Sequence, residues 1–212
     1  MSTENKEQMS IEMCSAVSDD QDLRERVRGI VMRALADRQW DRAEIREVLR
    51  ESFAGLGQGL GQRGGEAAGA VKEAVHGLDE AVGRSVYALR MAVEESWSSG
   101  RDFAQSDLKA AVDALRDLEK EMLDTLKDSA DKSQGWVKDA FADLHAHLSR
   151  NGTDTGSQVK DVVEALGSRL GAAAHGAAGE AREQARSTGE RLGAVASGIL
   201  RGLADALDGR KS

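Results

Sequence analysis

The sequence has no proline and only 3% aromatic residues in 212 positions. Proline breaks helices because its ring removes a backbone donor and clashes with the preceding turn, so its absence favours long, uninterrupted helices. Much of the hydrophobic content is alanine, which forms helices well but removes little apolar area from water. We therefore expect narrow apolar seams between helices rather than a thick globular interior.

The chain also lacks the marks of a secreted or membrane-spanning protein. Its single cysteine, Cys14, excludes an intrachain disulfide and is interpreted as a spectator thiol. The first residues, MSTENKEQMS, contain neither the basic nor the apolar segment of a signal peptide. No stretch approaches the length of about 18 apolar residues that a membrane-spanning helix needs. These absences predict a cytoplasmic protein without a transmembrane segment.

The net charge of −8 disfavours binding of nucleic acid by the whole chain, because phosphate backbones repel an acidic protein. Residues 22–50 are nevertheless rich in arginine, which leaves a nucleic-acid-associated hairpin as a minor alternative. The acidic residues interspersed among these arginines favour ion pairs within the helices instead.

Apolar residues recur at intervals of three and four through most of the chain, the pattern of amphipathic helices. The predicted fold class is all-α: an elongated bundle of long amphipathic helices with a looser C-terminal helical arm. We expect the following division: a disordered tail (1–20), a helical hairpin (21–54), a glycine-rich linker (55–65), a three-helix bundle (66–150), a loop (151–157), an amphipathic helical arm (158–208) and a tail (209–212).

The segment GLGQGLGQRGG, residues 55–65, contains a formal match to the dinucleotide-binding fingerprint, from Gly59 to Gly64. That fingerprint requires a preceding strand and a βαβ unit. Here a helix precedes it and no strand is predicted anywhere, so the segment is interpreted as a flexible linker.

One long helix is predicted from Glu66 to about Ser98, with Val71, Val82 and Val93 spaced 11 residues apart. An 11-residue period keeps an apolar stripe nearly straight. Glycines four apart in the C-terminal arm would let two helix backbones approach closely. The residues predicted to pack helices together or to contact a partner are Val71, Leu78, Val82, Leu89, Val93, Leu108, Leu115, Val137, Phe141, Leu144, Val159, Leu166, Gly198 and Gly202.

The sequence shows no catalytic apparatus. His145 and His147 lie two residues apart, so on a helix they point to different faces and cannot chelate one ion. No nucleophile elbow, Walker sequence or set of metal ligands is present, and paired carboxylates sit in charged runs. We therefore predict no catalytic, cofactor-binding or metal-binding residues, and no enzymatic activity.

Two blocks carry a resemblance to a known family: EIREVLRESFAG from Glu44 to Gly55, and DLKAAVDALRDLE from Asp107 to Glu119. They resemble an uncharacterised family of bacterial helical proteins with no assigned activity, over about residues 20–130. In general character the chain also resembles phasins, which coat polyester storage granules, and desiccation proteins rich in 11-residue repeats. The resemblances imply a helical protein and supply no site residues.

The leading functional hypothesis is a non-enzymatic scaffold or surface-coating protein. It would self-associate, most simply as a dimer, because thin seams bury little apolar area. Its amphipathic helices would pack on a partner protein or on an apolar granule or lipid surface. The alternative is a stress-protective protein that is partly disordered.

Overall fold

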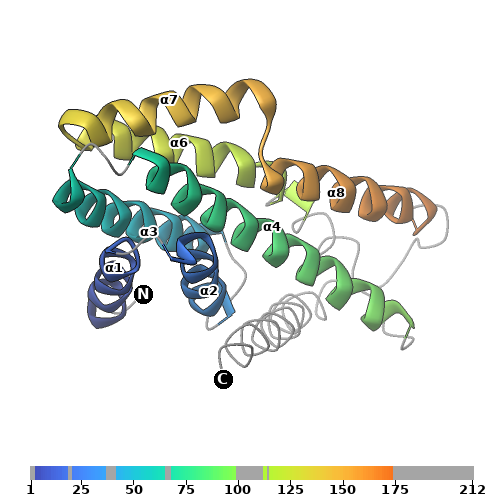
Figure 1. Ribbon diagram of the computed structural model, residues 1–212. Coiled ribbons are helices and arrows are strands. Elements are labelled where there is room, and N and C mark those ends of the chain that lie inside the picture. The colour runs from blue at the N-terminus through green and yellow to red at the C-terminus, as the bar shows by residue number, and fades with distance from the viewer. Residues whose placement is uncertain are drawn as a thin grey trace.

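The computed structural model describes residues 3–18, 21–36, 42–64, 68–98, 112–113 and 115–173 (Figure 1). Every regular element among these residues is an α-helix, which confirms the predicted all-α class. The helices are α1 (Thr3–Ala16), α2 (Leu23–Ala36), α3 (Arg42–Arg63), α4 (Ala68–Ser98), α6 (Leu118–Lys132), α7 (Gly135–Asn151) and α8 (Asp154–Ala173).

The helices α3 and α4 lie between two groups of helices. Helices α1 and α2 cover one side, and α6, α7 and α8 cover the other (Figure 1). The main partners of α4 are α2 and α8, whereas α3 packs chiefly against α1 and α6. Buried apolar side chains from every described helix belong to one continuous core. The interior is therefore a shared core rather than a set of separate seams.

Helix α4 begins two residues later than the predicted long helix and ends at Ser98. The side chains of Val71, Val82 and Val93 are all buried. Because their 11-residue spacing corresponds to about 3.67 residues per turn, the same face of a straight helix meets its neighbours along the whole length. This regular apolar stripe makes α4 the central element of the fold.

The prediction of a disordered tail over residues 1–20 is wrong for most of that segment, which forms α1. Met9, Met13 and Val17 are buried against the rest of the chain. The helix has almost no amphipathic signal, because these few apolar residues stand among polar ones. Its stability in the fold comes from a close approach to α3 rather than from a broad apolar stripe.

The predicted linker over residues 55–65 is instead the C-terminal half of α3, which continues to Arg63 and ends at Gly64 with a φ of +80°. Gly55 and Gly59 face α1. A Cβ atom at Gly59 would lie 2.2 Å from Cγ2 of Val17 and 2.7 Å from the carbonyl oxygen of Cys14. The missing side chains let the two helix backbones touch. This contact offsets the helix cost of about 1 kcal/mol that each interior glycine carries.

Two arginines hold the C-terminal end of α1. Nη2 of Arg26 donates a hydrogen bond to the carbonyl oxygen of Ala16 (2.7 Å), and Nη1 of Arg63 donates to that of Val17 (2.9 Å). The last carbonyls of a helix have no partner within the helix, and cations there also favour the negative end of its dipole. Both arginines therefore anchor α1 to α2 and α3.

The predicted hairpin and three-helix bundle do not exist as separate units. Helices α2 and α3 fall within the predicted hairpin range 21–54 and beyond it, yet α2 packs mainly on α4 and touches α3 only slightly. Within 66–150, α4 makes its largest contacts with α2 and α8, which lie outside that range. Local periodicity identified the helices, but the main partners of α2 and α4 are distant in sequence.

The first part of the predicted C-terminal arm (158–208) belongs to α8, which ends at Ala173. Val159, Val162 and Leu166 are buried against α4 and the core, so this part is an ordinary member of the bundle. The remainder of the arm, 174–208, lies outside the described residues, and so do Gly198 and Gly202. Leu108 also lies outside them.

Candidate functional site

The start of α8 corrects the prediction of a loop over 151–157. Only Gly152 and Thr153 separate α7 from α8, and Gly152 has a φ of +82°, which favours glycine. The backbone N–H of Gly156 donates to Oγ1 of Thr153 (2.7 Å), so Thr153 is the N-cap of α8. Threonine, aspartate and glycine are typical of loops and equally of helix starts.

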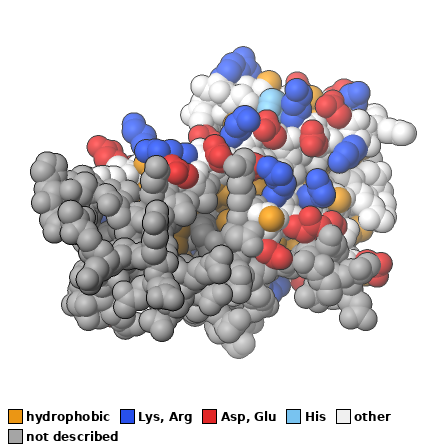
Figure 2. Space-filling view, turned by 180° about the vertical axis from the view of Figure 1, so that it is seen from behind, with side chains coloured by type: hydrophobic (Ala, Val, Ile, Leu, Met, Phe, Trp, Pro, Cys, Tyr) orange, Lys and Arg blue, Asp and Glu red, His pale blue; other side chains and the backbone are white. Residues whose placement is uncertain are grey.

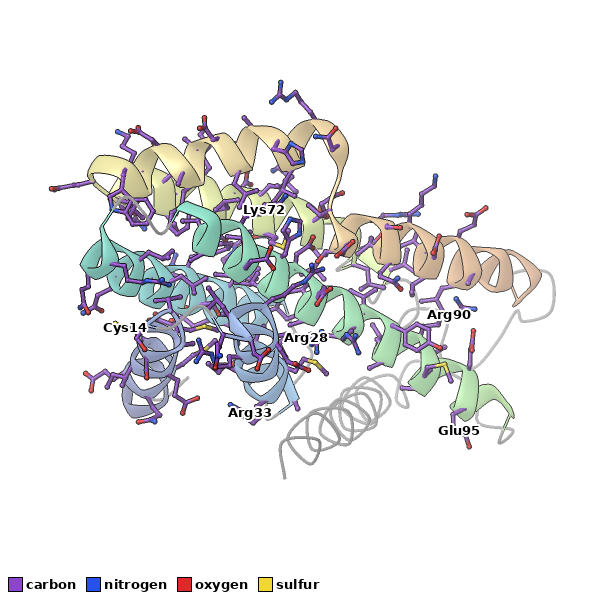
Figure 3. All side chains as sticks on the ribbon, in the orientation of Figure 1. Cys14, Arg28, Arg33, Lys72, Arg90 and Glu95 are labelled. Carbon is purple, nitrogen blue, oxygen red and sulfur yellow. The ribbon has the colours of Figure 1, made fainter. Side chains whose placement is uncertain are left out.

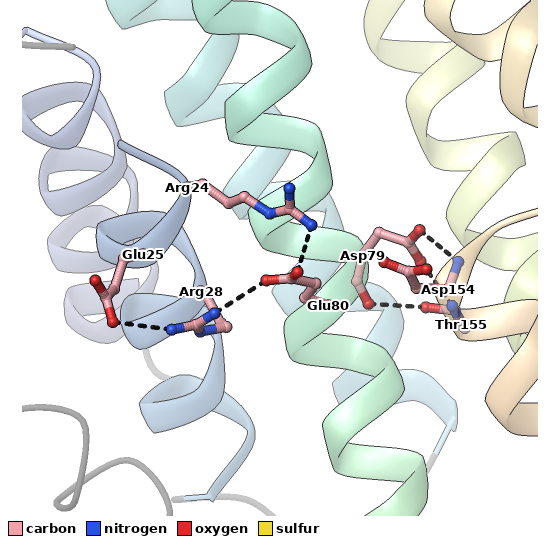
Figure 4. Close-up of polar contacts among 7 residues, drawn as sticks. All are labelled: Arg24, Glu25, Arg28, Asp79, Glu80, Asp154 and Thr155. Atoms are coloured by element: carbon pink, nitrogen blue, oxygen red, sulfur yellow. Dashed lines mark hydrogen bonds and ion pairs between the residues drawn. The ribbon is translucent and has the colours of Figure 1, made fainter. Parts of the chain in front are cut away.

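A carboxylate from α4 completes this helix start (Figure 4). Asp79 is buried, and its two oxygens accept hydrogen bonds from the backbone N–H groups of Asp154 (2.7 Å) and Thr155 (2.8 Å). The hydroxyl of Thr155 donates to the backbone carbonyl of Asp79 (3.1 Å). Burial raises the pKa of Asp79 above its ordinary value, and the hydrogen bonds from Thr155 and Asp154 offset only part of that effect.

A second carboxylate reaches the same helix start from α6. Oγ1 of Thr153 donates to Oε1 of Glu119 (2.9 Å), and a Cβ at Gly156 would collide with the Glu119 carboxylate. We call Asp79, Glu119, Thr153, Thr155 and Gly156 the capping junction. It joins α4, α6 and α8 and satisfies the first N–H groups of α8. Its carboxylates are engaged in holding helices together.

Beside the capping junction, Glu80 of α4 binds two arginines of α2 (Figure 4). Arg24 pairs with one carboxylate oxygen, and Nη1 of Arg28 lies 3.1 Å from the other. Partial burial acts to raise the pKa of Glu80. The hydrogen bonds from Arg24 and Arg28 outweigh it, so the pKa lies below its ordinary value. Figure 3 shows Arg28 between α2 and α4, in keeping with this bridging role.

Replacing Glu80 by glutamine is expected to weaken the pH dependence of stability in acid. The folded pKa is lower than the value of about 4.3 in an unfolded chain. The ionised carboxylate therefore stabilises the fold above that value and loses this contribution as the pH falls through the folded pKa.

Urea denaturation at several pH values measures this contribution of Glu80. The unfolding free energy of wild type minus that of E80Q should be constant near neutral pH and should shrink below about pH 5. Asp79 titrates in both proteins and cancels. A difference independent of pH would contradict the assignment.

Several described arginines of residues 22–50 form ion pairs or hydrogen bonds with other parts of the chain. Besides those that bind Glu80 and cap α1, Arg46 of α3 pairs through two nitrogens with the carboxylate of Glu121 on α6, with Nε at 2.6 Å. Glu121 is buried, whereas about half of the Arg46 side chain stays exposed. The sequence predicts ion pairs within helices, and Arg28–Glu25 and Arg50–Glu47 are such pairs. The pairs with Glu80 and Glu121 instead link different helices.

An open hollow of about 550 Å³ lies between α3, α6 and the start of α7, and we call it the α3 groove. Phe53 and Val137 are buried in its floor, where Phe53 packs edge-on against Phe141 with ring centroids 6.2 Å apart. The described part of its lining includes two cations and no carboxylate. The lining residues are Arg50, Phe53, Ala54, Gly57, Gln58, Gly61, Ser129, Lys132, Ser133, Gln134 and Val137.

Most of the predicted packing residues lie among those that the structure describes. The described ones are buried and belong to the common core: Val71, Leu78, Val82, Leu89, Val93, Leu115, Val137, Phe141, Leu144, Val159 and Leu166. They therefore pack the chain's own helices, and only Val137 also borders the α3 groove.

The described residues contain no group of three or more His, Cys, Asp or Glu side chains that could hold a metal ion. None of the described helices is long and apolar enough to cross a membrane.

Cys14 lies half-buried on α1 beside α3 (Figure 3). A second hollow, of about 480 Å³ between α4 and α7, mixes Lys72 and Arg150 with Asp143 and His147. The clusters of polar side chains among the described residues therefore serve mainly to hold helices together.

A comparison with known families places the chain. A family model matches residues 1–209, nearly the whole sequence. The chain belongs to DUF6781, a family of unknown function. The resemblance to a family without assigned activity is confirmed, and it covers more of this DUF6781 member than the predicted 20–130. No protein of curated function and no solved structure matches it.

Sequence reasoning missed the α3 groove in this DUF6781 member. Its lining comes from α3, α6 and α7, and most of these residues are small or polar. A signal exists in α3 alone: positions 50, 53, 54, 57, 58 and 61 follow the i, i+3, i+4 spacing of one helical face. The interpretation of residues 55–65 as a linker hid that face.

Proposed function

We propose that this protein is a non-enzymatic cytoplasmic scaffold that binds another protein chain through the outside of its helical bundle. The observation that carries the proposal is the use of the apolar stripes. In the described helices these stripes are buried in one intramolecular core. What remains outside is a charged surface with an open groove, whose lining includes both apolar and hydrogen-bonding groups.

The surface supports a protein partner over an apolar coat. Acidic and basic side chains alternate over the described surface that Figure 2 shows, and apolar side chains appear there only as small spots. Among the described large apolar residues, Ile11, Tyr87 and Met91 are exposed. Proteins that adsorb through amphipathic helices present a wide apolar face. In the part of the chain that the structure describes, such a face would require the bundle to open.

The burial of apolar surface in one core weakens the argument for self-association. The expectation of a dimer rested on thin apolar seams, whereas the described helices share a continuous core. A second copy of the chain is therefore one candidate partner among others. The fold does not require a dimer, so the oligomeric state has to be measured.

The scaffold proposal is tested by two measurements on the full chain. In flotation with neutral and anionic phospholipid vesicles and with triglyceride droplets, the chain should stay in the aqueous fraction. In crosslinked native lysate, it should be recovered in a complex with a second protein at defined stoichiometry. Quantitative flotation with droplets, with no protein complex, would contradict the proposal and favour the coating alternative.

A further inference from the structure

Helix α3 carries glycines on two opposite faces, and only one of them is covered in the described chain. Gly55 and Gly59 lie against α1, where a Cβ would meet atoms of α1 at 2.2–2.7 Å. Gly57 and Gly61 point the other way, since two residues turn a helix by about 200°. A Cβ at Gly57 would make ordinary contacts at 3.5 Å, and one at Gly61 would have nothing within 4 Å.

The second face borders the α3 groove and keeps it open. Both Gly57 and Gly61 line the groove, and any larger side chain at either position would project into it. The α3 positions that line it run from Arg50 to Gly61, about three turns or roughly 16 Å of helix. A depression of that length along one helix suits an elongated ligand better than a compact small molecule.

The charge of the groove is opposite to that of the whole protein. Among the described residues, Arg50 and Lys132 line it and no carboxylate does, in a chain with a net charge of −8. Arg50 lies 3.9 Å from Glu47 with more than half of its side chain exposed, a weak surface pair. Helix α7 begins at the groove after Gln134, makes no side-chain capping bond there and has no acidic residue in its first turn. The positive end of its dipole adds to the two cations.

We propose that the α3 groove docks an acidic helix of a partner protein. The inference deepens the proposed scaffold function and rests on it. The partner helix lies along α3 as α1 does on the opposite face, and its backbone approaches Gly57 and Gly61. Its apolar side chains pack on Ala54 and on the floor over the buried Phe53 and Val137, and its carboxylates pair with Arg50 and Lys132. Such helix-in-groove recognition uses apolar anchors at helical spacing and charges at the rim.

Three labelled helical peptides of about 18 residues, long enough to be helical when stapled, provide the probe. All are alanine- and leucine-based and differ only at two positions seven residues apart, chosen to face the groove rim, which carry glutamate, glutamine or lysine. Fluorescence anisotropy against the full chain should show the glutamate peptide binding at least about tenfold more tightly than the lysine peptide. Equal binding of the two, or no binding of the glutamate peptide, would overturn the proposal.

Variants locate the binding. Arg50→Glu combined with Lys132→Glu should reverse the order of the peptides, whereas the matched pair Lys127→Glu with Lys160→Glu, exposed and outside the groove lining, should preserve it. Gly57→Leu and Gly61→Leu should each weaken the glutamate peptide by about tenfold or more, with helical circular dichroism retained. The Gly61 variant has open space at its Cβ and serves if the Gly57 variant misfolds. Unchanged binding by Gly61→Leu would overturn the proposal.

Other occupants give other results. A peptide-free dimer in sedimentation equilibrium that Gly61→Leu converts to monomer would assign the groove to a second copy and overturn the partner proposal. If the peptides fail to bind while the complex from native lysate survives Gly61→Leu, the groove inference fails and the scaffold function stands. If wild type forms no complex in lysate, the scaffold function itself fails.

Discussion

Replacement of Gly59 by alanine is expected to lower the free energy of unfolding by about 1–3 kcal/mol, the usual cost of overpacking a well-filled contact. The new Cβ would lie 2.7 Å from the carbonyl oxygen of Cys14 and 2.2 Å from Cγ2 of Val17. The oxygen belongs to the backbone of α1, so relief requires the whole helix to move. Chemical denaturation measures the loss, and hydrogen exchange should show faster exchange in α1 before the rest of the bundle.

Gly61 provides the matched control, two residues further along the same helix. Nothing lies within 4 Å of a Cβ built there. Gly61→Ala should therefore raise the free energy of unfolding by up to about 1 kcal/mol, because alanine is the better helix former. Opposite signs at the two positions would show that α3 is helical through the glycine-rich segment and that α1 touches only one of its faces. Equal small gains at both positions would show that α1 does not dock as described.

Replacement of Asp79 by alanine should also cost about 1–3 kcal/mol, because it leaves buried hydrogen-bond donors without partners. The backbone N–H groups of Asp154 and Thr155 both donate to this carboxylate. Asp79→Asn should recover part of the loss. Its amide oxygen can accept one of the two bonds, while its NH2 group faces the other donor.

Asp139→Ala on the exposed face of α7 is the control for Asp79→Ala, and its effect should stay within about 0.5 kcal/mol. Thermal and urea unfolding measure the stability of each variant, and hydrogen exchange should localise the loss at the start of α8. A neutral Asp79→Ala substitution would show that the carboxylate does not cap α8.

The helical class and the central helix could be predicted because their signals are local. The absence of proline and the 11-residue apolar period predict α4, and the predicted start lies two residues before the observed one. Helix α1 could not be predicted in this way. Its partner is a glycine face of α3 rather than a side-chain stripe, and Met9, Met13 and Val17 are too few to give a periodic pattern. The glycines of residues 55–65 suggest a flexible linker, but the spacing by four of Gly55 and Gly59 equally predicts a close contact between helices.

The polar features depend on tertiary contacts, which sequence periodicity does not contain. Asp79 is a buried carboxylate in the middle of an amphipathic helix, and its role appears only when the start of α8 lies beside it. The same holds for the α3 groove, because Arg50 and Lys132 belong to different helices and are more than 80 positions apart in the sequence. The sequence alone showed acidic and basic residues in mixture and predicted local pairs.

Hydrogen exchange of α4 in the full chain tests most directly whether the apolar stripes are used inside the molecule. Amides around Leu78, Val82 and Leu89, which are fully or almost fully buried, should exchange only through global unfolding. Their protection should be the same with and without phospholipid vesicles or triglyceride droplets. Fast exchange of these amides in the isolated chain, slowed only when an apolar surface is added, would contradict the account and identify a coating protein.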